Sequence, residues 1–100
     1  MGKFLKVQNL ETFEEMLRNK DLKISKAIVE TALENLFNKK RFIHILEVEL
    51  VEEGQTYDIT LDRNNLLDTL KQNLEIHELH EDYLGCIEIN KAIKQLEILV

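Results

Sequence analysis

The chain has 100 residues, of which 44% are hydrophobic and 32% are charged, and its formal net charge is −6. This length and balance predict a single domain over residues 1–100 and exclude a disordered chain, which would contain fewer apolar residues. The sequence has no apolar run near the ~20 residues of a membrane-spanning helix, no secretory signal in its first ten residues and one cysteine, so we expect a cytoplasmic protein without a membrane partner.

The N-terminal segment predicts a strand followed by a short helix. Residues 3–7, KFLKV, have the pattern of a short strand. Thr12 is followed three residues later by Glu15, which is the spacing of a capping box at the start of a helix. Phe13 lies on the apolar side of this helix, which we expect to end near Asn19 or Lys20.

A longer helix is predicted over residues 25–40, with Ser25 as its N-cap. Its apolar residues recur at helical spacing and cover two sides, which predicts the central helix of the fold. The cations at positions 39–41 would then follow its C-terminus, where the macrodipole favours positive charge. The apolar residues are Ala27, Ile28, Val29, Ala32, Leu33, Leu36 and Phe37.

The pattern then changes to an alternation with a period of two, which predicts a β-hairpin with its turn at Glu52–Gln55. His44 shares a strand face with the apolar residues, and we expect it at the edge of the core. The apolar face is predicted to consist of Leu46, Val48 and Leu50 against Tyr57, Ile59 and Leu61.

Four glutamates of this region are expected at an exposed strand edge and in the turn. Charges in such places block edge-to-edge aggregation, which is a sufficient reason for them. They are Glu47, Glu49, Glu52 and Glu53.

Two further helices complete the predicted fold. Asp62 is the expected cap of the first helix, which runs to about Leu79, and Asp82 is the expected cap of the second. The short break between them predicts an antiparallel helical hairpin. The fold class is therefore α+β, with two N-terminal helices, a β-hairpin that residues 3–7 extend to a three-stranded sheet if they join it, and a C-terminal helical hairpin. The buried stripes are Leu66, Leu67, Leu70 and Leu74 in the first helix, and Cys86, Ile89, Ile93, Leu96 and Val100 in the second.

The stretch EDYLGCIEINKAI resembles part of the UVR motif, a small helical hairpin of bacterial excision-repair proteins and several stress-response regulators. That motif runs from a leucine-bearing helix through acidic residues to Glu-Asp-Tyr-Glu, small residues and Leu-Arg-Asp-x-Ile. The resemblance covers about a third of the chain. The matching residues are Glu81, Asp82, Tyr83, Cys86, Ile89 and Ile93.

Three positions depart from the motif, because Leu84 stands in place of a glutamate and Asn90 and Lys91 stand in place of the Arg-Asp pair. The resemblance implies protein–protein contact through the hairpin, and no catalysis belongs to the motif itself. The stretch also has a structural interpretation. Tyr83 would pack its ring across the first helix, and the small Gly85 and Cys86 would let the two helices approach closely.

Candidate chemistry is limited to two histidines and one thiol. His77 and His80 are three residues apart and close to acids, which is compatible with a metal site. We find no second cluster to complete such a site and expect solvated histidines at a helix end. Cys86 belongs to the predicted buried stripe, where a thiol is a poor nucleophile. We therefore expect a protein that is not an enzyme, with no catalytic residues, metal or cofactor.

Charge divides the chain into a basic part and an acidic part. Residues 1–41 carry nine Lys and Arg against six Asp and Glu, whereas residues 42–100 carry four against thirteen. The first hypothesis is a small protein-binding or regulatory protein whose acidic C-terminal hairpin binds a protein with a basic surface. The residues predicted to contact the partner are Glu78, Glu81, Tyr83 and Glu88.

Two alternatives remain open. The basic part could serve a nucleic-acid-associated accessory factor, although a pI near 5.0 opposes a general nucleic-acid role. The acidic part could instead serve an inhibitor that mimics the charge of a nucleic acid. The excess of Lys, Asn and Ile, 28 residues in all, is typical of an AT-rich bacterial or viral genome. The candidate nucleic-acid-binding residues are Lys23, Lys26, Lys39, Lys40 and Arg41.

Overall fold

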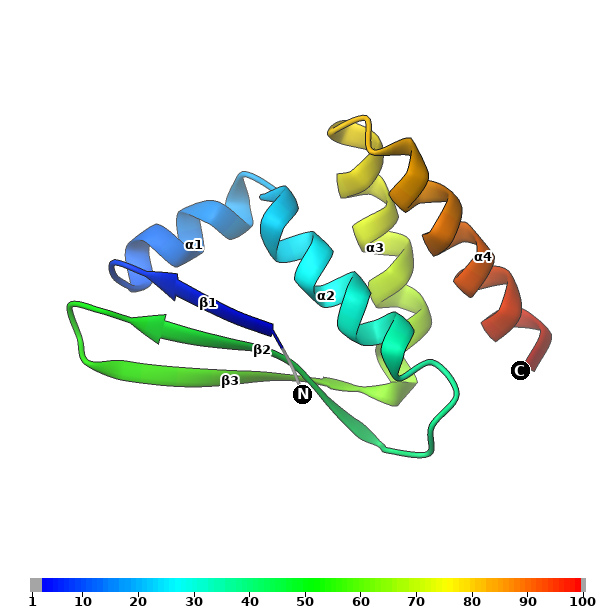
Figure 1. Ribbon diagram of the computed structural model, residues 1–100, viewed down its shortest axis with the longest axis horizontal. Coiled ribbons are helices and arrows are strands. Elements are labelled where there is room, and N and C mark those ends of the chain that lie inside the picture. The colour runs from blue at the N-terminus through cyan, green and yellow to red at the C-terminus, as the bar shows by residue number, and fades with distance from the viewer. Residues whose placement is uncertain (1–2, 100) are drawn as a thin grey trace.

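The computed structural model describes residues 3–99 and confirms the predicted α+β fold (Figure 1). A three-stranded mixed sheet is combined with two N-terminal helices and a C-terminal helical hairpin. The elements are β1 (Lys3–Val7), α1 (Leu10–Arg18), α2 (Leu22–Glu34), β2 (Phe42–Leu50), β3 (Gln55–Asp62), the 3₁₀ helix η1 (Arg63–Asn65), α3 (Leu66–Leu79) and α4 (Tyr83–Leu99).

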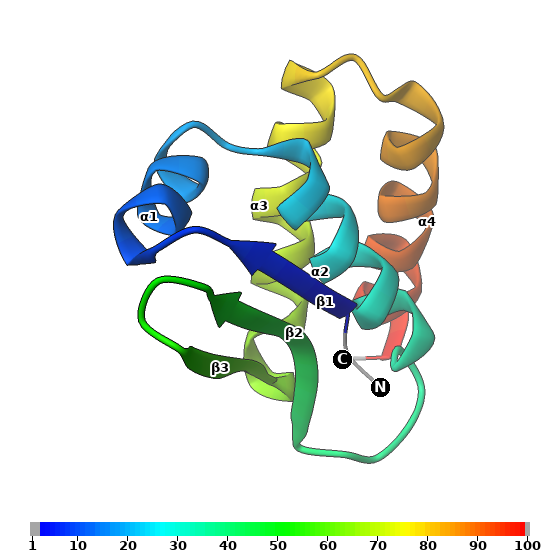
Figure 2. The same cartoon turned by 60° about the vertical axis from the view of Figure 1, so that its left-hand side comes forward.

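The sheet has the order β1-β2-β3, so the predicted N-terminal strand does join the hairpin. β1 is parallel to β2, with Lys3 opposite Leu46 and Val7 opposite Leu50, and β2 is antiparallel to β3. Both α1 and α2 lie in the connection between the two parallel strands. The turned view in Figure 2 shows β1 in front of α2 and α3, so the helices cover one face of the sheet and leave the other open.

A β-bulge between His44 and Leu46 decides which side chains of β2 enter the core. Ile43 and Ile45 are buried before the bulge, whereas Leu46, Val48 and Leu50 are buried after it. The extra residue shifts the alternation by one position. The predicted placement of His44 was therefore wrong. His44 lies on the open face, with its Nε2 atom 3.3 Å from Oδ1 of Asp58.

Glu47 and Glu49 lie on the open face of β2, which is the central strand, and not at the predicted edge. They are half-buried because neighbouring strands flank them on both sides. Glu52 and Glu53 do lie in the exposed turn, where Glu52 accepts hydrogen bonds from side-chain amides of the segment between β1 and α1. Those amides belong to Gln8 and Asn9.

Both N-terminal helices begin earlier than predicted. The side chain of Asn9 accepts a hydrogen bond from the backbone N–H of Thr12 at 2.8 Å, so Asn9 is the N-cap of α1. Asp21 caps α2 in the same way. Ser25 is therefore an interior residue of α2, where its buried hydroxyl donates to Oδ1 of Asn73 on α3 at 2.7 Å.

α2 ends at Glu34, earlier than predicted, and a cation that is distant in the sequence binds the carbonyl groups that directly follow the helix. The guanidinium of Arg63 donates hydrogen bonds to the carbonyl oxygens of Asn35 at 2.8 Å and Leu36 at 3.2 Å. A positive charge at this end of a helix complements the macrodipole. The three cations predicted at the C-terminus lie instead in the loop before β2, and they are Lys39, Lys40 and Arg41.

Two phenylalanines are exposed, and one of them, Phe37, belongs to the apolar residues predicted for the longer helix. Phe37 is 64% exposed in the loop after α2, and Phe42 is 59% exposed on the open face of the sheet. The guanidinium carbon of Arg41 lies 5.3 Å from the centroid of the Phe42 ring, which is within the range of a cation–π contact.

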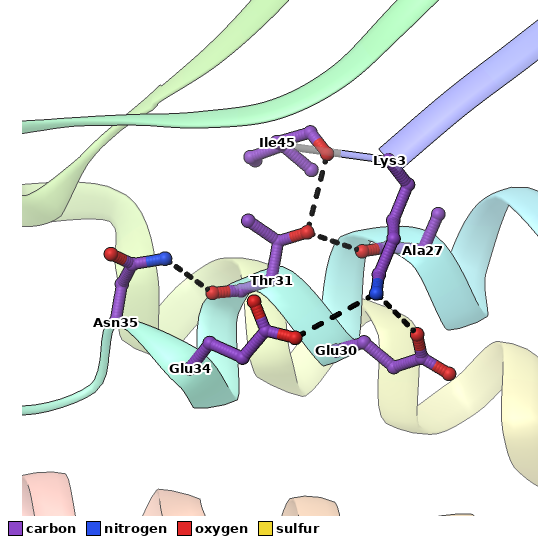
Figure 3. Close-up of polar contacts among 7 residues, drawn as sticks. All are labelled: Lys3, Ala27, Glu30, Thr31, Glu34, Asn35 and Ile45. Atoms are coloured by element: carbon purple, nitrogen blue, oxygen red, sulfur yellow. Dashed lines mark hydrogen bonds and ion pairs between the residues drawn. The ribbon is translucent and has the colours of Figure 1, made fainter. Parts of the chain in front are cut away.

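Thr31 joins α2 to the bulge (Figure 3). Its hydroxyl oxygen is fully buried and lies 3.0 Å from the carbonyl oxygen of Ala27 and 3.3 Å from that of Ile45. Buried polar groups are costly without such partners. A side chain of α2 thus provides a hydrogen-bond partner for the carbonyl group of Ile45, the extra residue of the bulge in β2.

Lys3 links β1 to the same helix through ion pairs at its surface (Figure 3). Its Nζ atom lies 3.3 Å from Glu30 and 3.7 Å from Glu34. All three side chains are substantially exposed, and exposed pairs of this kind typically contribute little to stability.

One contiguous cluster of buried side chains connects the sheet with all four helices. In the C-terminal hairpin, Cys86, Ile89 and Ile93 of the predicted stripe are buried, and Leu96 is half-buried. Val100 lies outside the described residues. Between residues 3 and 99, no helix has both the length and the hydropathy that are needed to cross a bilayer.

The buried and exposed faces of α4 can be tested with two isoleucines. We expect Ile89→Ala, at a fully buried position, to lower the free energy of unfolding by about 2–5 kcal/mol. Ile87→Ala on the same helix, at a position that is 62% exposed, should change it by less than ~0.5 kcal/mol. Urea unfolding followed by circular dichroism measures both, and equal losses would contradict the assigned faces.

Candidate functional site

Large apolar side chains are exposed together where α3 ends and α4 begins, at the top of Figure 1. Leu79 is 62% exposed, Tyr83 66%, Leu84 78% and Ile87 62%. We call these four residues the tip patch. Single exposed apolar residues are ordinary, but several at one end of a hairpin are typical of an interaction surface. The predicted packing of Tyr83 across the first helix was wrong, since its side chain points into solvent.

The patch arises because α4 is apolar on two sides. Ile87 lies one turn after Tyr83 and Leu84, so the three side chains are neighbours on the surface of the helix. Cys86 and Ile89 face α3 instead and are buried. The sequence prediction included only the buried side, and the second set of apolar positions was the signal that it missed.

Acidic residues surround the tip patch. Glu78 is exposed near the end of α3, Glu81 in the turn and Glu88 in the second turn of α4. Glu81 has a φ of 56°, and its N–H donates to the carbonyl of Glu78 at 3.0 Å, so the turn is tight. The structure therefore brings all four residues of the predicted contact set to one end of the hairpin.

A buried histidine fixes the geometry of the turn. His77 is only 2% exposed, so the prediction of a solvated side chain was wrong for it. Its Nδ1 atom lies 2.8 Å from Oδ2 of Asp82, the residue that caps α4 through the N–H of Gly85. The hydrogen bond from His77, together with that from Gly85, lowers the pKa of the Asp82 carboxyl below its ordinary value. The end of α3 is thereby linked to the start of α4.

Gly85 is required beside this pair. A Cβ atom at that position would stand 2.6 Å from Nδ1 of His77 and closer still to Oδ2 of Asp82. The predicted role of Gly85 in a close approach thus has a specific cause, because the group to be accommodated is the hydrogen-bonded pair of His77 and Asp82.

The two histidines of the hairpin do not share a site. His80 is exposed, and its Nε2 atom lies 2.8 Å from the carbonyl oxygen of Lys20, between α1 and α2. The Nε2 atom of His77 is buried without a hydrogen-bond partner among the described residues. Within residues 3–99, no group of three or more His, Cys, Asp or Glu side chains is arranged to hold a metal ion.

Cys86 is buried as predicted. Burial raises the pKa of its thiol, and the negative charges of Glu78 and Asp82 raise it further. A thiol in this environment stays protonated and is a weak nucleophile.

The predicted basic residues form two separate groups. Lys23 and Lys26 lie in the first half of α2, whereas the cations at 39–41 follow its other end. A helix of 13 residues is about 20 Å long, so the groups do not form one patch. Lys26 lines a shallow pocket of about 230 Å³ beside Asp82 and Glu88, close to the tip patch.

No protein-family model, no curated protein and no solved structure matches this chain. The resemblance to the UVR motif stays a prediction.

The link between His77 and Asp82 predicts a pH dependence. Because folding lowers the pKa of Asp82 from 3.8, its carboxylate stabilises the fold above that pH, and this contribution is lost as the pH falls through the folded pKa. Asp82→Asn should therefore be less stable than the wild type at pH 7, and the difference should shrink below pH 4. Urea unfolding between pH 7 and pH 2.5 measures it. Asp68→Asn, at an exposed position of α3, controls for the loss of a charge. A difference that does not change with pH would contradict the link.

A second prediction concerns Gly85→Ala. Alanine normally stabilises a helix by about 1 kcal/mol relative to glycine. Here we expect a loss of stability, because the added methyl group forces Asp82 away from His77. In the background of Asp82→Ala, which removes the carboxylate, the same substitution should cost less. A double-mutant cycle measures the difference, and strict additivity would show that the methyl group does not disturb the pair.

Proposed function

We propose that the chain is a small, non-enzymatic protein-binding protein that docks a partner on the tip patch. The observation that carries the proposal is the set of four exposed apolar side chains with Glu78, Glu81 and Glu88 around it. Protein interfaces commonly have an apolar centre and a polar rim. The partner that fits has an apolar surface bordered by Lys or Arg.

The construction of the turn supports this proposal. The bond between His77 and Asp82 and the tight turn at Glu81 hold the patch in one arrangement before a partner arrives. A preorganised surface loses less conformational entropy on binding than a flexible one. The acids would act at longer range, because charge complementarity mainly accelerates association.

The two alternatives have less support. Nucleic-acid binding needs positive charge along one surface, and the basic residues lie at opposite ends of α2. A mimic of nucleic-acid charge needs regularly spaced anions, but at the tip Leu84 and Ile87 separate the acids with apolar surface.

Two isoleucines on α4 give a matched test. Ile87 belongs to the tip patch, whereas Ile98, which is 82% exposed, lies three turns away. A partner captured from native cell extract by the wild-type protein should be lost with Ile87→Asp and retained with Ile98→Asp. Retention with both variants would overturn the proposal.

The kinetics of the captured partner then test the acidic rim. The pair Glu78→Lys and Glu81→Lys should slow association at least tenfold at low salt, and it should change stability by less than ~0.5 kcal/mol. Glu14→Lys with Glu15→Lys on α1 makes the same change in net charge away from the tip. Equal slowing by both pairs would show that net charge, and not the rim, attracts the partner.

A further inference from the structure

The outer edge of β3 is open for pairing. β3 has eight residues and is hydrogen-bonded only to β2, so its second edge is free among the described residues. In the left half of Figure 1, β3 is the lowest of the three strands. Natural proteins block such edges with charged side chains, above all lysine, or with proline, a bulge or a short strand. The sequence of β3, QTYDITLD, has neither lysine nor proline, and the bulge lies in β2. Its charged residues are the two acids Asp58 and Asp62, which repel acidic strands and attract basic ones.

An apolar groove runs beside this edge on the face that carries the helices. Its volume is about 340 Å³. Leu10 of α1 is 43% exposed on one side of the groove, and Tyr57 of β3 is 47% exposed on the other. The inner face of β3 is therefore less covered than that of β2. The remaining apolar lining is Phe13, Val48, Leu50 and Ile59.

The opposite face of the same edge carries negative charge. Glu47 of β2 stands directly opposite Asp58 of β3 in the register, and like charges in such a pair are unfavourable. Lys6 is paired with Glu49, so it does not offset them. His44 contacts Asp58 but carries a charge only when it is protonated. A cation on a strand added next to β3 would pair with Asp58.

We propose that the free edge of β3 binds an extended segment of a partner protein in which apolar residues alternate with Lys or Arg. The segment adds a fourth strand to the sheet, its apolar side chains enter the groove beside Tyr57, and its cations lie beside Asp58. Backbone hydrogen bonds supply affinity in this mode of recognition, and alternate side chains supply specificity.

Charge favours such a segment over a second copy of the chain. A second β3 would bring its own Asp58 to the same edge, in a protein whose net charge is already −6. The site is also independent of the tip patch, because β3 and the turn between α3 and α4 lie at opposite borders of the molecule in both Figure 1 and Figure 2.

A synthetic peptide of alternating Lys and Val residues is the probe. In a titration followed by ¹H–¹⁵N NMR, the amide shifts should concentrate in β3 and the start of α1. Shifts that concentrate at the tip patch, or no shifts at millimolar peptide, would overturn the proposal.

Substitutions in the groove and on the edge locate the site. Leu10→Asp and Asp58→Lys should each weaken peptide binding at least tenfold. Leu17→Asp is the control, because Leu17 is a similarly exposed leucine of α1 outside the groove. Equal weakening by Leu10→Asp and Leu17→Asp would contradict the assigned position.

Methylated peptides distinguish strand addition from general attraction between a cation and an acidic protein. An added strand turns only alternate N–H groups toward its neighbour. Peptides methylated at the Lys amides or at the Val amides have the same charge, but one of them should bind and the other should not. Equal binding by both would overturn the proposal.

Discussion

The β-bulge in β2 is the feature on which the rest of the fold depends. A regular strand of nine residues can place only alternate side chains on one face. A regular β2 would turn Phe42 and His44 inward ahead of Leu46, Val48 and Leu50. With one extra residue at Ile45, the strand buries Ile43 and Ile45 in their place, because the inward positions change from odd to even numbers. Thr31 contacts the carbonyl of Ile45, so the irregularity and the helix that covers it are joined directly.

The helical hairpin is built on this layer. α2 lies between the sheet and α3, and the buried hydrogen bond from Ser25 to Asn73 fixes the contact between the two helices. α4 then packs on α3 through Ile89 and Ile93. The outer side of α4 has nothing packed on it among the described elements, which leaves the tip patch in solvent. The two proposed surfaces therefore lie on the outermost elements of the fold, which are α4 in the helical layer and β3 in the sheet.

The existence and order of the elements could be predicted from the sequence because each has a strong periodic pattern. Helix boundaries could not, since Asn9 and Thr12 are both good N-caps and only the folded backbone selects one of them. The carbonyl groups that directly follow α2 are bound by Arg63, which is remote in sequence. No local sequence pattern indicates the bulge, because the burial of side chains that it permits depends on the rest of the fold.

For the candidate site, the acidic residues and Tyr83 could be predicted from charge and from the likeness to a known hairpin. The apolar centre was missed because Leu84 and Ile87 look like core residues in a helix that also has a genuine core face. His77 was misplaced for a related reason. Its partner, Asp82, is beyond the end of its helix, and no pattern within α3 indicates a contact across the turn.

The parallel pairing of β1 with β2 has a consequence for the order of folding. Lys3 lies opposite Leu46, so this contact closes a loop of more than forty residues, whereas the β2–β3 hairpin and the α3–α4 hairpin close within short segments. Contacts between residues distant in sequence form slowly, because loop closure costs entropy before it is rewarded. On the ribosome, the strand that is synthesised first waits until β2 has emerged before it can pair. Until β1 arrives, one edge of the apolar strand β2 is unpaired, whereas in the finished sheet β2 is paired on both sides and only β1 and β3 have outer edges.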